Sequence, residues 1–507
     1  MNFLNQHILS FLLFSPFVGI VLLLLIPNGQ ERLMHRVAFL ASLIPFALSL
    51  FLWSCFPETG PLNQGSLESP FSLNEVVPWI PSMGIFYRIG VDGVSLLLVL
   101  LTTFLMPIVF VASWTSIGRR VREYYLAFLF LEVGLIGVFI AVDLFLFYLF
   151  WELVLIPMYL IIGIWGGERR IYAAIKFVLY TMVGSLLMLA AVIYLYFAAG
   201  HSFNFVDLMK ISLPVVAQKW LFGAFVLAFA IKVPLFPFHT WLPDAHVEAP
   251  TGGSVILAGL LLKMGTYGLF RLGFPLFPEA MAALTPLLIT LSVIGILYGA
   301  LVAMVQTDIK KLVAFSSVSH MGFVVLGLAA TSTIASSGAV LQMINHGLST
   351  GALFLLVGML YERRHTRRIA DFGGLAKIMP VYTTLFLIVA LSSIGLPGTN
   401  GFIGEFLILI GSFKNHPVAT GLSTLGVIFA AVYLLWMVQR VFLGPVTHEE
   451  NNGLSDLSKR EIGLLLPIII LIFAIGFYPA PLLKKIEPAV KRWMEMKQGV
   501  VHPRVVQ

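Results

Sequence analysis

The chain has 507 residues, of which 59% are hydrophobic and 11% are charged, and its mean hydropathy is +0.97. Soluble globular proteins carry about 25% charged residues, so this composition excludes a soluble globular protein and indicates a polytopic membrane protein. The net charge of +7 comes mostly from basic residues that flank apolar runs, and it gives no reason to expect a nucleic-acid partner.

Apolar runs of about twenty residues, each long enough to cross a hydrocarbon core of about 30 Å as a helix, recur along the whole sequence. The first run lacks a basic leading segment and a small-residue cleavage site, so we expect it to remain as a helix rather than act as a signal peptide. We predict an all-α polytopic membrane protein with about fourteen transmembrane spans. The spans are 8–26, 34–53, 93–113, 122–141, 143–162, 173–198, 219–247, 254–272, 281–304, 311–331, 336–360, 381–412, 420–442 and 462–482.

Basic residues alternate between successive loops and predict the orientation. One set of loops carries Arg32, Arg36, Arg119, Arg120, Arg122, Arg169, Arg170, Lys310, Lys311, "YERRHTRR" and "SKRE". Because short basic loops stay in the cytoplasm, we expect both termini outside it. The short C-terminal tail runs against this rule, since it contains Lys484, Lys485, Lys491 and Arg492.

Two predicted spans contain helix-breaking residues: "FAIKVPLFPFHTW" in the seventh and "LSSIGLPGTNGFIGEFL" in the twelfth. Lipid cannot satisfy the backbone groups that a break exposes, so both breaks should face protein or water. Interrupted spans at comparable positions in the two halves of a chain are typical of inverted-repeat transporters, whose substrate and ion sites lie near the midplane of the bilayer.

Seven ionisable residues fall well inside predicted spans: Glu132, Glu152, Lys232, Lys263, His320, His346 and Glu405. A charge at the centre of a span costs about 2.5–3.5 kcal/mol on insertion scales, so seven such groups need mutual pairing and hydration. Glutamate, lysine and histidine side chains that follow one another in space can pass protons along, and we predict such a relay here. A movable pair of Glu152 and Lys232 would act as its switch, because an adjacent opposite charge favours the charged form of each.

Structural explanations remain open for each residue. The two switch residues could form a static ion pair, Lys263 could extend toward an interface, and both histidines could be hydrogen-bonded packing residues. Glu132 could pair with loop arginines, and Glu405 could cap a half-helix. Asp143 lies between two spans, where we expect an interfacial position.

The segment "HTWLPDAHVE" raises the question of a metal site, since it contains His239, Asp244, His246 and Glu248. Two prolines interrupt the region, and the loop charges put it at the cytoplasmic surface. A structural cap or a vestibule for proton uptake is therefore favoured over metal binding. The single cysteine, Cys55, allows no intrachain disulfide and no iron–sulfur cluster. "GTNGFIGEF" follows no predicted strand and does not indicate a dinucleotide site, and we expect no cofactor in this chain.

Three segments carry a resemblance that covers essentially the whole chain: "PFHTWLPDAHVEAPTGGSVILAGLLLKMGTYGLFR", "QTDIKKLVAFSSVSHMGFV" and "INHGLSTGALFLLVGMLYERRHTR". They resemble the M-type antiporter-like subunits of respiratory complex I, the proton-pumping NADH–quinone oxidoreductase. The resemblance implies fourteen helices with two inverted five-helix repeats, spans 4–8 and 9–13, in which helices 7 and 12 are broken. The units would be 1–113, 114–273 (first repeat), 274–442 (second repeat) and 443–507 (C-terminal helix and short tail).

The resemblance also implies residue roles. Glu152 is similar to the fifth-helix glutamate and Lys232 to its seventh-helix partner, while Lys263 is similar to the central eighth-helix lysine. His320 and His346 match polar positions of the central axis. Glu405 matches the twelfth-helix site, where L- and N-type subunits and multisubunit sodium/proton antiporters usually place lysine.

The same resemblance implies a proton translocase in a bacterial inner membrane, beside the L- and N-type subunits and other membrane-arm subunits. NADH, FMN, iron–sulfur clusters and quinone would be bound by partner subunits. Three alternatives stay open: a subunit of a multisubunit sodium/proton antiporter, a subunit of a ferredoxin- or hydrogenase-linked complex, and a passive spacer in a membrane assembly.

Overall fold

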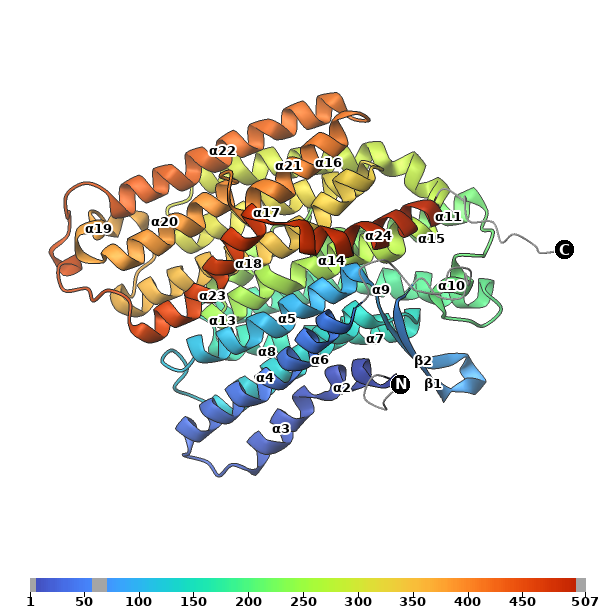
Figure 1. Cartoon of the computed structure of the whole chain (residues 1–507), viewed down its shortest axis with the longest axis horizontal. Helices are drawn as coiled ribbons and strands as arrows, with labels where there is room; N and C mark the ends of the chain where they lie inside the picture. Colours follow the sequence, from blue (N-terminus) through green and yellow to red (C-terminus); the bar gives the residue numbers. More distant parts are fainter. Residues whose placement is uncertain (1–5, 57–70, 498–507) are drawn as a thin grey trace.

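The structure is a computed structural model that describes residues 6–56 and 71–497. Long apolar helices run side by side along the longest axis of the molecule (Figure 1). The first three spans are α2 (Ile8–Phe14) continued by α3 (Pro16–Leu25), then α4 (Glu31–Cys55) and α5 (Gly93–Ala112).

Ten further spans form two consecutive sets of five. The first set is α6 (Val121–Ile140), α7 (Leu144–Leu153) with α8 (Leu155–Trp165), α9 (Arg170–Ala198), α11 (Val215–Lys232) with α12 (Trp241–Glu248), and a continuous helix over Thr251–Leu276. That last helix comprises α13 (Thr251–Ile256), η2 (Leu257–Leu261), α14 (Leu262–Gly268), η3 (Leu269–Gly273) and α15 (Phe274–Leu276). The second set is α16 (Pro278–Met304), α17 (Ile309–Ala329), α18 (Thr333–Arg364), α20 (Pro380–Ile394) with α21 (Asn400–Phe413), and α22 (Pro417–Phe442).

The chain finishes with α23 (Lys459–Phe477) and α24 (Ala480–Lys497). Within the described residues, 13 helices are long and apolar enough to cross a membrane, and α20 with α21 supplies one more span in two shorter pieces. The expectation of an all-α polytopic protein with about fourteen spans is thus confirmed. Short helices α10 (Phe205–Leu208) and α19 (Leu375–Ile378) lie in connecting segments.

Both predicted breaks are present, and each falls in the fourth span of its set of five. Residues 233–240 separate α11 from α12, and residues 395–399 separate α20 from α21. Prolines remove a backbone donor in each break, and Gly395 has the left-handed φ of 83° that ends α20. Because five is odd, consecutive sets of five crossing spans must run in opposite senses through the membrane, which fits the inverted repeat.

One element departs from the expected all-helical pattern. The loop before the third span contains an antiparallel hairpin of β1 (Leu73–Ile80) and β2 (Ile85–Val91), in register from Leu73↔Val91 to Ile80↔Ile85. Its tight turn needs the left-handed φ of 64° at Gly84. Glu75 of β1 accepts hydrogen bonds from the backbone N–H groups of Leu9 and Ser10 at the first helix. The hairpin therefore fixes the start of the first span.

A buried ion pair joins the start of α5 to the end of the eighth span. Both terminal nitrogens of Arg271 donate to the carboxylate of Asp92 at 2.7 Å, and Trp493 of α24 donates to the same group. The guanidinium lies between the rings of Phe71, Tyr267 and Trp493. Burial disfavours the charged carboxylate, but the Arg271 guanidinium still holds the pKa of Asp92 below its usual value. The pair ties α24 and the eighth span to the N-terminal helices.

Replacing Asp92 with asparagine should destabilise the fold by about 3–5 kcal/mol, because it leaves the Arg271 charge buried without its partner. Thermal denaturation of the purified assembly in detergent measures the loss. As a control, Lys491→Gln breaks the exposed pair of Lys491 and Glu495 and should change stability by no more than about 1 kcal/mol. Equal melting of the two variants would contradict a stabilising role for the buried pair.

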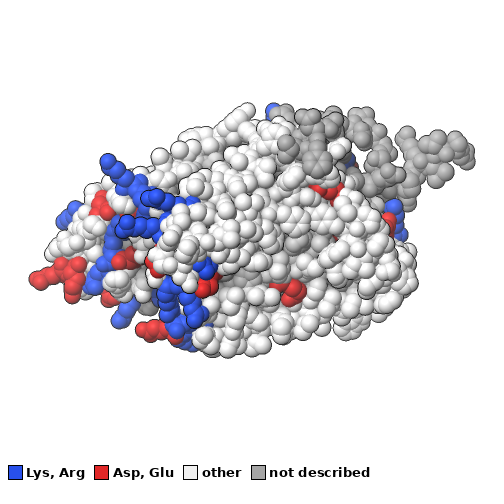
Figure 2. All heavy atoms as spheres, turned by 90° about the horizontal axis from the view of Figure 1, so that it is seen from below, with Lys and Arg blue, Asp and Glu red and all other residues white. Residues whose placement is uncertain are grey.

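Charged side chains gather at one end of the molecule. Figure 2 shows Lys and Arg, together with Asp and Glu, crowded at the end where the loops around α19 lie in Figure 1, with few charges elsewhere on the face in view. The basic loops therefore lie at one end, as the orientation prediction requires.

Candidate functional site

Four of the predicted relay residues form one continuous chain inside the bundle, and all four are buried. Nζ of Lys263 in α14 lies 2.6 Å from Nδ1 of His346 in α18. The ring of His346 is 5.9 Å, centroid to centroid, from the ring of His320 in α17. Nδ1 of His320 is 2.8 Å from Oε1 of Glu405 in α21. The chain Lys263–His346–His320–Glu405 thus spans four helices and links the two sets of five spans.

The eighth span presents Lys263 directly after a π-helical stretch, η2. The ammonium group also donates a hydrogen bond to the carbonyl of Ala258, five residues earlier. Single π turns are frequent at functional sites. With one partner in its own helix and one in α18, the lysine is held at the boundary between the two sets.

The break in the twelfth span positions Glu405. Asn345 of α18 donates to the backbone carbonyl of Asn400, at the start of α21, at 2.7 Å, and Ser392 donates to the side chain of Asn400 at 2.6 Å. Gln342 then donates to Oε1 of Glu405 at 3.1 Å. Side chains around the break therefore supply the partners that a continuous helix would not need, and they aim the carboxylate at His320.

A small cavity lies beside the two histidines. Its volume is about 10 Å³, and its lining includes His320, Asn345, His346 and Ser393. Four buried atoms of these residues have no hydrogen-bond partner among the residues that the structure describes: both histidine Nε2 atoms, Asn345 Oδ1 and Ser393 Oγ. A polar space of about this size holds one water molecule when two to four polar partners surround it. The cavity fits a water molecule that bridges the histidines.

Lys232 and Glu152 form a separate group. Lys232 is the last residue of α11 before the break and is 1% exposed. Its ammonium nitrogen lies 5.4 Å from the ring centre of Trp151 and 5.3 Å from that of Phe177. Glu152 is near enough to attract Lys232 electrostatically, but among the described residues Lys232 forms no ion pair with an N···O distance up to 4.0 Å. The movable pair of Glu152 and Lys232 stays a prediction.

Glu132 joins neither group. It is completely buried in α6, and neither carboxylate oxygen has a hydrogen-bond partner within the described chain. It does not pair with a loop arginine, which was the structural alternative for this residue. Asp143 lies between α6 and α7, where it is fully buried and caps α7 by accepting from the N–H groups of Phe145 and Leu146.

The residues and the fold identify the family. The family "NADH:quinone oxidoreductase/Mrp antiporter, TM" matches residues 141–432, which include the broken seventh and twelfth spans and six of the seven predicted relay residues. The chain belongs to this family.

Similar proteins agree with this assignment over almost the full length. The chain is 44% identical over 502 residues to NADH-quinone oxidoreductase subunit M of Rhodobacter capsulatus, covering 96% of each protein. It superposes on a chain of respiratory complex I from Thermus thermophilus with a TM-score of 0.87 and 35% identity, covering 96% of this chain and 99% of that one. A chain of the Mrp complex from Dietzia has a TM-score of 0.81 at 22% identity, covering 95% of this chain and 52% of that one, and shares the fold alone.

Sequence reasoning missed the position of one further histidine, His246. The residue is 0% exposed, and its ring stacks on that of Phe354 with 4.5 Å between the ring centroids. Neither ring nitrogen has a hydrogen-bond partner within the described chain. It interacts electrostatically with Lys263 and with Lys310. The sequence indicated a vestibule in this segment, but spacing alone could not place the side chain between the central lysine and the basic end.

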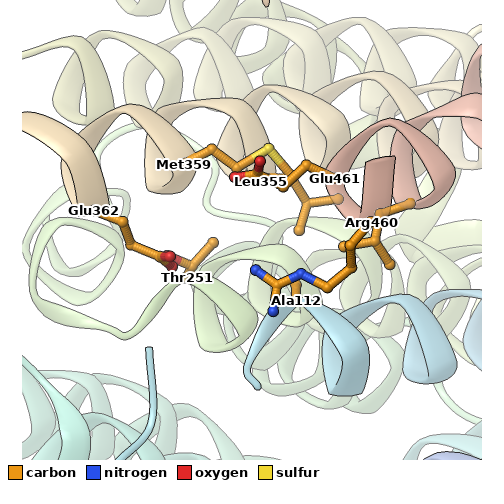
Figure 3. Close-up of a pocket in the computed structure, with 8 residues that line it drawn as sticks. Ala112, Thr251, Leu355, Met359, Glu362, Arg460 and Glu461 are labelled. Carbon is orange, nitrogen blue, oxygen red and sulfur yellow. The ribbon is translucent and has the colours of Figure 1, made fainter. Parts of the chain in front are cut away.

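A hollow of about 920 Å³ opens at the basic end of the molecule. It reaches Lys310, which donates to the carbonyl of Ala249 at 2.6 Å and interacts electrostatically with the buried His246. A side pocket shares Thr251 and Glu362 with the hollow, and Arg460 points into it from α23 (Figure 3). The hollow and its side pocket place charged side chains, among them Lys310, Glu362 and Arg460, at the outer end of the buried groups.

The four residues of "HTWLPDAHVE" do not converge on a metal site. Asp244 pairs with Lys176 at 2.7 Å, and Glu248 accepts from the backbone N–H of Arg169 at 2.9 Å. No group of three or more His, Cys, Asp or Glu side chains in the described part of the chain is arranged to hold a metal ion.

Proposed function

We propose that this chain carries protons across the membrane along Lys263, His346, His320 and Glu405, as a membrane-arm subunit of a proton-translocating NADH–quinone oxidoreductase. The main support is that these four side chains, from four different helices, lie next to one another in a row. Lysine and imidazole nitrogens both bind and release protons, and the carboxylate at the end of the chain accepts one. A water molecule in the cavity beside the histidines would complete the connection between their rings.

We infer that protons are taken up through the basic hollow. The order from the surface is Lys310, His246 and then Lys263, and each neighbouring pair interacts electrostatically. An imidazole with two unpartnered nitrogens is able to accept a proton on one side and release it on the other. The vestibule interpretation of this segment is favoured by these contacts.

We infer that Lys232 and Glu152 act as a switch. Glu152 attracts Lys232 electrostatically without an ion pair, and a closer approach of the two side chains would stabilise the charge on Lys232. The break after Lys232 interrupts the helical hydrogen bonds: the indole N–H of Trp241 donates to the carbonyl of Ile231 at 2.8 Å, where a continuous helix would use its own N–H group.

The assembly would lie in a bacterial inner membrane, with the basic end in the cytoplasm and both termini on the other side. NADH, FMN, iron–sulfur clusters and quinone would belong to partner subunits, because one cysteine cannot supply the ligands of a cluster. The L- and N-type subunits would flank this chain in the membrane arm. The Mrp antiporter alternative is weaker, since that likeness shares the fold alone, and Glu405 stands where those antiporters usually have lysine.

The test is Lys232→Ala in the assembled complex, reconstituted into vesicles. We expect the number of protons moved per electron to fall sharply while the subunits still assemble, because the switch loses its cation and Glu152 loses its partner. An unchanged proton-to-electron ratio would contradict the relay and favour a passive spacer. Sodium-dependent exchange by the wild-type vesicles without NADH would instead favour the antiporter alternative.

A further inference from the structure

An apolar groove runs along the seam between the N-terminal helices and the last two helices. Its volume is about 850 Å³. Helices α4 and α5 form one wall, and α23 and the start of α24 form the other. Ile344 and Leu348 of α18 form the floor, with 6% and 1% of their surface exposed. We call this feature the seam groove.

The seam groove has the length and the surface of a site for an acyl chain. Along α23 it extends from Gly463 to Tyr478, which corresponds to roughly 22 Å at 1.5 Å per helical residue. One leaflet of the hydrocarbon core is about 15 Å thick, so the groove is long enough for a chain that enters from one leaflet. Its rim is apolar and open, since Leu466 and Ile470 are 50% and 57% exposed.

Basic and aromatic side chains stand at the end of the groove that lies away from the basic loops. Trp53 and Tyr478 line this end, as aromatic residues do at membrane interfaces. The ammonium group of Lys485 lies 4.7 Å from the ring centre of Trp53 and donates to the carbonyl of Phe56. Lys484, beside it on α24, is exposed. Lys485 is buried and bonded within the protein, so Lys484 is the lysine available to a ligand here. Lys484 is among the basic residues that ran against the charge rule for orientation, and an anionic ligand at this end fits its position.

We propose that the seam groove binds one anionic glycerophospholipid, with an acyl chain against Ile344 and Leu348 and the headgroup at Lys484. The floor residues flank His346 in sequence, so the groove runs along the helix that carries the relay. An unfilled groove would forfeit dispersion contacts along its walls and would admit water beside α18. The bound lipid therefore seals the helix on the side away from the relay.

Photolabelling tests the proposal in the intact complex. The assembly is reconstituted into phosphatidylglycerol vesicles that contain phosphatidylglycerol with a diazirine in its acyl chain, and the labelled peptides are mapped after illumination. We expect label at Ile344 and Leu348, which membrane lipid reaches only by entering the groove. Label confined to the rim residues Leu466 and Ile470 would overturn the proposal, and it is the result expected if a neighbouring subunit fills the groove.

Two glycines provide a matched pair of variants. A side chain at Gly463 would point into open space inside the groove, and one at Gly421 of α22 would point into open space outside it. Gly463→Phe should lower floor labelling about tenfold, equivalent to roughly 1.4 kcal/mol of binding, while Gly421→Phe leaves it unchanged. Equal labelling in both variants would refute the site. Lys484→Glu should reduce labelling by the anionic probe more than labelling by a phosphatidylethanolamine probe, and equal reduction would refute the headgroup assignment.

Discussion

Replacing Lys263 with methionine is expected to abolish or sharply reduce proton translocation by the assembled complex. Lys263 joins the uptake side to the histidines: it interacts electrostatically with His246 on one side and lies 2.6 Å from Nδ1 of His346 on the other. Methionine fills a similar volume and keeps the apolar stem packed, but it cannot bind a proton. The measurement is the proton-to-electron ratio in vesicles together with the rate of NADH oxidation.

The control makes the same chemical change at an exposed position. Lys414 follows α21 at the surface, and Lys414→Met should leave the ratio unchanged. A normal ratio in Lys263→Met would show that the lysine takes no part in the relay and would favour the structural explanation that the sequence allowed, a side chain that extends toward an interface. Loss of assembly in that variant alone would point the same way, whereas an assembled complex that oxidises NADH without pumping supports the relay.

The sequence predicted the relay residues because charge inside an apolar span is costly and therefore conspicuous. Lys263, His320, His346 and Glu405 each stood out in this way, and the structure joins all four. The same rule also selected Glu132, which lies apart from them in α6. Depth in the membrane can be read from one span at a time, but contact between two spans depends on how the helices pack, and the hydrophobic pattern alone does not specify that packing.

The breaks were predictable because proline and glycine act locally, through a missing donor and an accessible left-handed φ. The hairpin before α5 was not predicted. Its strands are stabilised by contacts with the first helix through Glu75, and such contacts leave no periodic signal in a short loop. The π-helical stretch before Lys263 was missed for a related reason, since α-helical and π-helical turns carry the same apolar residues and differ only in packing.

Glu405→Gln is expected to stop proton transfer at the end of the chain while preserving the shape of the site. A glutamine side chain can still accept the hydrogen bond from Gln342 at the position of Oε1. It cannot accept a proton from His320, whose Nδ1 lies 2.8 Å from that oxygen. The proton-to-electron ratio should therefore fall sharply, and Glu405→Asp, which keeps a titratable group, should retain part of it.

Glu132→Gln provides the matched control, because it removes a buried carboxylate that touches no other charged group in the described structure. The two variants make identical chemical changes at equally buried sites in the same membrane protein, so a difference between them isolates the effect of connection to the relay. If Glu405 only capped the half-helix α21, glutamine would serve as well as glutamate, and both variants would pump normally. If Glu405 is the terminal proton acceptor, Glu405→Gln loses pumping and Glu132→Gln does not, whatever the cost of burying either carboxylate.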